Sequence, residues 1–115
     1  MHKNGQGLKQ DDKEAARWYR KAANQGNADG QTFLGIMLEH GRGVKQDEKE
    51  AVRWFRKAAD QGDADGQKCL GAMHANGRGV KQDDKEAVRW FRKAADQGNS
   101  AAQKCLDVMH ENARG

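Results

Sequence analysis

Proline is absent from these 115 residues, and the β-branched and aromatic residues that favour strands are scarce. Alanine, lysine and glutamine, which favour helix, are abundant instead. Without strand formers the chain has one regular structure available throughout its length. We therefore predict an all-α protein.

Side chains for catalysis or metal binding are few. Ser100 is the only serine and Thr32 the only threonine, and neither lies in a nucleophile motif. The four histidines and two cysteines include no Cys-x-x-Cys and no His-x-x-x-His pair. The sequence therefore predicts no enzyme activity, no metal site and no cofactor.

Long apolar runs are missing as well. No segment approaches the roughly 18 apolar residues of a membrane span, and the first residues lead into no signal-peptide core. Hydrophobic content is 36% and charged content 33%, so the core must be thin. We expect no membrane partner and a cytoplasmic protein as the sequence stands; a leader missing from it would make the protein periplasmic or secreted.

What the sequence does contain is a repeat. Residues 43–62 return at 79–98 with one change, from Glu48 to Asp84, and residues 8–26 are a looser copy. The three tryptophans, Trp18, Trp54 and Trp90, lie 36 residues apart. A fixed period of 20 to 50 residues is typical of stacked supersecondary units.

Each period predicts two helices. A helix with a tryptophan follows each of the capping residues Asp11, Asp47 and Asp83 and ends at a glycine three turns or more later. A second helix type is expected at about 28–40, 64–76 and 100–112. Tryptophan and the phenylalanine or tyrosine after it recur at core positions, which predicts packing between repeats.

A specific pattern runs through these helices: Ala64-x-x-Gln67-x-x-Leu70-Gly71-x-Met73-x-x-Asn76-Gly77-x-Gly79-Val80-x-x-Asp83-x-Lys85-x-Ala87-x-x-Trp90-x-x-Lys93-Ala94-Ala95-x-x-Gly98. It resembles the Sel1-like repeat, a relative of the tetratricopeptide repeat. The resemblance implies a right-handed superhelical α/α solenoid of about six helices in antiparallel pairs. It divides the chain into a partial repeat at 1–27, repeats at 28–63 and 64–99, and a half repeat at 100–115.

The resemblance also implies a function: a non-enzymatic adaptor, of a kind found in bacteria, that binds another protein or peptide. If the second helix type lines the concave face, as in tetratricopeptide repeats, the partner-binding positions vary between copies while the core does not. They are Asp29, Thr32, Ile36, Glu39, His40, Asp65, Lys68, Ala72, Ala75, Asn76, Ala101, Lys104, Val108, Glu111 and Asn112.

Two other functions stay open. Some cysteine-rich relatives are described as binding or hydrolysing penicillins, although this chain has one cysteine in each of two repeats. The tryptophan helices also carry a repeated basic set that could bind nucleic acid, but acidic residues interleave with it and favour an ordinary solvated face. The basic set is Lys13, Arg17, Arg20, Lys21, Lys49, Arg53, Arg56, Lys57, Lys85, Arg89, Arg92 and Lys93.

Three smaller expectations follow. Cys69 and Cys105 occupy equivalent positions too far apart for a disulfide, so we predict two buried free thiols. His2, His74 and His110 share a repeat position with Leu38, which indicates packing rather than metal binding. The first and last repeats lack a neighbour within the sequence, whether Met1 is a natural start or a fragment boundary, so self-association through the ends is expected.

Overall fold

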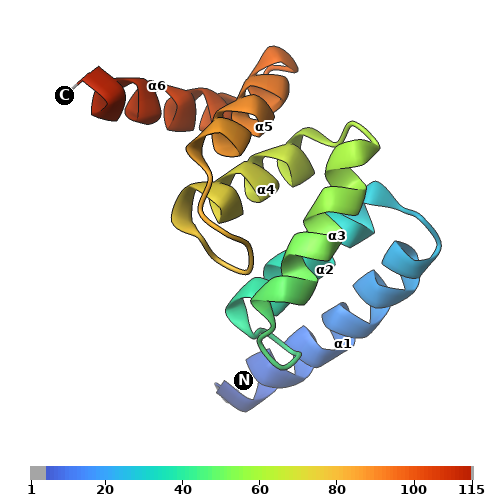
Figure 1. Ribbon diagram of the computed structural model, residues 1–115. Coiled ribbons are helices and arrows are strands. Elements are labelled where there is room, and N and C mark those ends of the chain that lie inside the picture. The colour runs from blue at the N-terminus through green and yellow to red at the C-terminus, as the bar shows by residue number, and fades with distance from the viewer. Residues whose placement is uncertain (1–4, 115) are drawn as a thin grey trace.

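The computed structural model describes residues 5–114, with side chains described from Asp11 to Glu111. Six helices follow one another: α1 (Gly5–Asn24), α2 (Ala28–His40), α3 (Glu48–Asp60), α4 (Ala64–Asn76), α5 (Asp84–Asp96) and α6 (Ser100–Arg114). Each described helix packs on the next, and the body is elongated, at 49 × 29 × 26 Å. Figure 1 shows the helices stacked in chain order from α1 to α6. The predicted all-α solenoid is confirmed.

Side-chain caps set the helix starts. The Asp47 and Asp83 carboxylates accept hydrogen bonds from the backbone N–H groups of Glu50 and Glu86, at 3.0 and 3.1 Å. Asn27 caps α2 in the same way at 2.7 Å. These interactions satisfy N–H groups that have no partner within the helix, so the capping residues read from the sequence begin the helices there.

The start of α1 differs from the prediction. Asp11 was expected to be an N-cap, but α1 already begins at Gly5. In the later copies the capping residue is held by the preceding helix, because Asp47 N–H donates to Leu38 O and Asp83 N–H to His74 O. Nothing within the described residues holds Asp11 in this way, so the helix continues through it.

The core is distributed between the repeats. Leu34 and Leu70 are fully buried at equivalent positions of α2 and α4 and share a cluster with Phe55 of α3. Phe91 of α5 lies in a second cluster with Leu106 of α6. Gly35 and Gly71 allow the phenylalanine rings to lie against the helix backbone. A core built from contacts between neighbours is what a linear array requires.

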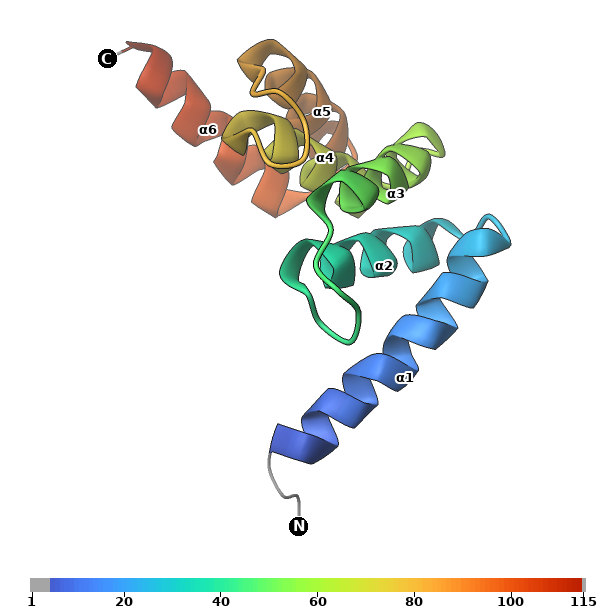
Figure 2. The ribbon, with the colours of Figure 1, turned by 60° about the horizontal axis from the view of Figure 1, so that its bottom comes forward.

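Contacts between the helices extend beyond neighbours in the sequence. α2 contacts α4 directly as well as α3, whereas α6 packs on α5. In Figure 2 α6 lies at one end of the stack and α1 at the other, so both present a face that no described helix covers. No helix within the described residues is both long and apolar enough to cross a membrane.

Candidate partner-binding surface

The predicted binding positions divide into two groups by exposure. Those exposed to solvent are Asp29, His40, Asp65, Asn76, Ala101, Lys104, Val108 and Glu111, and those half-buried are Ile36, Glu39, Lys68, Ala72 and Ala75. They come from α2, α4 and α6. Asn112 lies beyond the residues whose side chains the structure describes.

Thr32 does not belong to an exposed surface, and the prediction that it does is wrong. Its side chain is only 3% exposed. The hydroxyl donates a 2.8 Å hydrogen bond to Oδ2 of Asp63, the residue that caps α4. Thr32 therefore joins α2 to the residue that caps α4, and the approach of these two helices covers its side chain.

Two further predicted positions are engaged by other parts of the chain. The carboxylate of Glu39 forms an ion pair with Arg78 at 2.6 Å, and Asp65 accepts a hydrogen bond from Asn99 at 2.9 Å. A second carboxylate, Glu48, pairs with Arg78 at 2.8 Å, and the hydrogen bond that Arg78 donates to it raises the pKa of the guanidinium. Arg78 therefore stays charged and joins α2, α3 and the loop before α5.

The structure brings five of the predicted positions together around one groove of about 620 Å³ between α4, α5 and α6. They are Ala72, Ala75, Asn76, Lys104 and Val108. Most of the lining residues are apolar, and one of them, Val108, is 57% exposed. This groove, called the C-terminal groove below, offers an apolar floor with polar groups at the margin, as binding clefts usually do.

Sequence reasoning missed the remaining lining residues. They are Asp84, Val88 and Phe91 of α5 and Cys105, Met109 and His110 of α6. Val88, Phe91 and Met109 occupy repeat positions that are buried in the preceding copy, where Val52, Phe55 and Met73 lie in the core. Within the described residues no further helix pair packs on α5 and α6, so Val88 and Met109 are only half-buried, whereas Phe91 remains 2% exposed.

A second hollow of about 360 Å³ lies on α1 around Trp18, and Gly43 and Val44 of the loop between α2 and α3 also line it. Trp18 is 61% exposed, with Lys21 Nζ 5.1 Å from the ring centre. The prediction of packing between repeats is therefore wrong for Trp18, although Trp90, at the same repeat position, is 4% exposed. Trp90 has α3 to pack against, and Trp18 has no such helix within the described residues.

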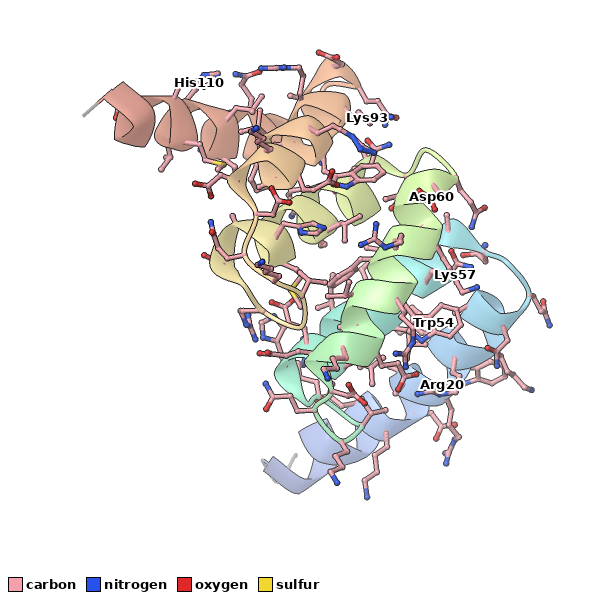
Figure 3. The ribbon with its side chains drawn as sticks, viewed as in Figure 1. Arg20, Trp54, Lys57, Asp60, Lys93 and His110 are labelled. Carbon is pink, nitrogen blue, oxygen red and sulfur yellow. The ribbon has the colours of Figure 1, made fainter. Side chains whose placement is uncertain are left out.

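The exposure of Trp54 lies between those of Trp18 and Trp90. It is half-buried, and its indole N–H donates to Oε2 of Glu50 at 3.1 Å. Arg20 of α1 pairs with the same oxygen at 3.2 Å, and Figure 3 shows the labelled Arg20 and Trp54 on neighbouring sides of α1 and α3. An acidic residue thus neutralises a basic one between repeats.

Three basic residues of the tryptophan helices, Arg17, Arg20 and Arg89, form ion pairs with acidic residues. Arg17 pairs with Glu14 at 2.6 Å and Arg89 with Glu86 at 3.6 Å, both on exposed surface. Lys57 and Lys93 instead lie over tryptophan rings. These contacts fit a solvated helix face better than a phosphate-binding ridge.

The residues with nucleophilic potential are poorly placed for chemistry. Burial raises the pKa of the Cys69 thiol to about 12, which disfavours the reactive thiolate. Both cysteines are free, but they are half-buried rather than fully buried as predicted, and Cys105 lines the C-terminal groove. Within the described residues no group of three histidine, cysteine or acidic side chains could hold a metal ion.

Known proteins that resemble this chain contain the same repeat. The Sel1 repeat model matches residues 1–27, 28–63 and 65–99. A solved structure of c5321, a protective antigen of uropathogenic Escherichia coli with an SLR fold, is 42% identical with a TM-score of 0.84. That alignment covers 88% of this chain but 22% of the E. coli protein. No curated protein matches the chain significantly in sequence.

Two further solved structures are similar to this chain. A Sel1 repeat protein from Oxalobacter formigenes is 37% identical, with a TM-score of 0.79 over 88% of this chain and 42% of that one. Helicobacter pylori cysteine rich protein B is 34% identical, with a TM-score of 0.74 over 79% of this chain and 68% of that one. With three family matches along its length, the chain belongs to the Sel1 repeat family.

Proposed function

We propose that this chain is a non-enzymatic protein-interaction module that holds a segment of another protein on the surface formed by α2, α4 and α6. The family of Sel1 repeats is typically used for protein–protein interaction. The observation that carries the proposal is the C-terminal groove, which is apolar at its floor and lies where α4 and α6 present residues that differ between copies.

The variation is concentrated at the margin of that groove. Ala72, Ala75 and Asn76 of α4 stand where α2 has Ile36, Glu39 and His40. The core residues beneath them, such as Leu34 and Leu70, are the same in both copies. A constant scaffold with a variable surface allows binding specificity to change without loss of the fold.

The test is affinity capture from the native cell with three versions of the chain. Val108→Asp puts a charge into the groove, and Gln103→Glu adds the same charge at an exposed position of the same helix that does not line the groove. A partner retained by the wild type and by Gln103→Glu, but lost with Val108→Asp, supports the proposal. A partner retained equally by all three contradicts the assigned surface.

The proposal that the chain is not an enzyme needs a separate test, because some cysteine-rich relatives are described as binding or hydrolysing penicillins. The purified chain is incubated with a chromogenic β-lactam, alongside a Cys105→Ser variant that changes the thiol in the groove. We expect no hydrolysis above the buffer rate. Turnover that co-purifies with the chain, and that an inactivated sample lacks, would contradict the non-enzymatic assignment.

A further inference from the structure

Asn76 and Gly77 form a dipeptide that is prone to cyclise without an enzyme. The backbone nitrogen that follows an asparagine can attack the side-chain amide, and a glycine leaves that nitrogen unshielded because it has no Cβ atom. Asn76 is the last residue of α4, is exposed and lines the C-terminal groove. The second Asn-Gly pair of the sequence begins at Asn4, which lies outside the described residues.

The other described asparagines are less suited to this reaction. The side chains of Asn27 and Asn99 cap helices, where they accept hydrogen bonds from the N–H groups of Gly30 at 2.7 Å and Ala102 at 2.9 Å. No described asparagine other than Asn76 is followed by glycine. Asn76 therefore combines an accessible side-chain amide with the least hindered backbone nitrogen.

The end of α4 controls access to that nitrogen. Gly77 N–H donates a hydrogen bond to Met73 O, and Arg78 N–H donates to the same oxygen at 3.0 Å. Attack on the side chain requires Asn76 to leave the helical conformation, which breaks both hydrogen bonds. The reaction therefore proceeds from the fraction of molecules in which the end of α4 is locally open.

The side chain of Arg78 opposes this opening. It pairs with Glu39 at 2.6 Å and with Glu48 at 2.8 Å, and Val80, two residues later, packs against the core. These contacts hold residues 77–82 against the preceding repeat. Because the ion pairs are partly exposed, their loss should raise the open fraction by a small factor rather than abolish the fold.

The preceding repeat has the same backbone but lacks the reactive amide. His40 and Gly41 occupy the equivalent positions, and Gly41 has φ of 68°, against 64° for Gly77. An imidazole ring offers no amide carbon to the following nitrogen. Asn76→His is therefore a control that the protein already uses at the same place in its own repeat.

From these observations we propose that Asn76 is a site of spontaneous covalent modification. When the end of α4 opens, the nitrogen of Gly77 attacks Cγ of Asn76. A C–N bond forms, and the side-chain nitrogen leaves as ammonia with the proton of the Gly77 N–H, so a succinimide ring results. Water then opens the ring at either carbonyl and gives aspartate or isoaspartate. The inference does not depend on the proposed function.

Both products change the C-terminal groove. Each places a carboxylate where the unmodified chain has a neutral amide, in a groove that Asp84 and Lys104 also line. Isoaspartate in addition inserts one carbon atom into the backbone between residue 76 and Gly77. The two hydrogen bonds to Met73 O cannot then form in their present geometry, so the modified chain should hold Arg78 less firmly.

The experiment incubates the purified full chain in mildly alkaline buffer and follows the tryptic peptide of residues 69–78 by liquid chromatography and mass spectrometry. We expect two products with the mass of the acid, aspartate and isoaspartate, which chromatography separates. Chains carrying Asn76→His should give neither. Aspartate without isoaspartate would indicate direct hydrolysis of the side chain and would overturn the inference.

The rate tests the role of the helix end. Glu39→Gln combined with Glu48→Gln removes both partners of Arg78 but leaves the reacting peptide unchanged, and should speed the conversion about two- to fivefold. About 1 M salt should speed the wild-type chain in the same direction, which tests the ion pairs without a substitution. A rate that neither change alters, or no conversion of the folded chain while chain unfolded in urea converts fully, would contradict the inference.

Discussion

Gly35 of α2 lies directly against the ring of Phe55 of α3: a Cβ atom at Gly35 would be 2.6 Å from Cε1 of that ring. The ring is fully buried and cannot move aside without disturbing its neighbours. Gly71 and Phe91 repeat the relationship in the next pair of helices, at 2.9 Å. Close approach of the two helices therefore explains a residue that disfavours helix in the middle of each.

Gly35→Ala should consequently destabilise the protein. Alanine gains about 1 kcal/mol in helix propensity, but overpacking of a close-packed core costs about 1–3 kcal/mol and shifts the ring. We expect a lower urea midpoint with an unchanged slope. Adding Phe55→Leu should make the combined loss smaller than the sum of the two single losses. A more stable Gly35→Ala protein would show that the contact is not close in solution.

His74→Leu should stabilise the protein. His74 is 7% exposed, and neither ring nitrogen has a hydrogen-bond partner within the described residues. An unsatisfied buried polar group costs about 1–3 kcal/mol, and Leu38 is buried at the same position of the preceding repeat. We expect a higher Tm in thermal unfolding. The matched change His110→Leu, at an exposed position, should leave Tm nearly unchanged.

Arg78→Met should destabilise the stack in a salt-dependent way. Its ion pairs with Glu39 and Glu48 join consecutive repeats, but the arginine is about one-third exposed, so we expect a loss of about 1 kcal/mol in dilute buffer. The difference from wild type should shrink in about 1 M salt, which screens the pair. Arg53→Met, at an exposed position of α3, serves as control. A loss independent of salt would assign the effect to packing of the side-chain stem.

The two thiols should differ in reactivity. Because burial raises the pKa of Cys69 to about 12, this residue stays protonated at pH 8 and should react with a disulfide reagent only as the protein unfolds. Cys105 lines the C-terminal groove and should react first. Cys69→Ser and Cys105→Ser assign the two phases, and a fast phase that survives Cys105→Ser would contradict the order.

The same pKa predicts how stability depends on pH. Below pH 9 the Cys69 thiol is neutral in both the folded and the unfolded chain, so it adds no pH dependence. Between pH 9 and about 12 the unfolded chain loses this proton while the folded one keeps it, so stability should fall as pH rises. Cys69→Ser should remove that part of the decline in urea titrations at pH 9 to 11.

The helix boundaries were largely predictable because they depend on local interactions. Asp47, Asp83 and Asn27 cap the helices that follow them, and Gly62 and Gly98 take positive φ after the tryptophan helices, as expected. Asp11 shows the limit of this reasoning. Its local sequence matches the other caps, but the helix that holds the equivalent residue elsewhere is not among the described elements.

The binding surface was predicted only in part, because exposure depends on the neighbouring repeat. Thr32 follows the pattern of an outward-facing residue yet is covered by the next helix, and Glu39 is engaged by Arg78. Val88 and Met109 follow the pattern of core residues yet are only half-buried and line the groove. Periodicity identifies the face of a helix on which a residue lies, but not whether another element packs there.

The sequence by itself determined the helical repeat, its 36-residue period and the family, because these follow from spacing and local capping. Only the tertiary structure decided which equivalent residues differ in environment: Trp18 is 61% and Trp90 4% exposed at the same repeat position. The reason is physical. In a linear array each side chain takes its environment from the repeats on either side, so identical segments differ at the ends of the stack.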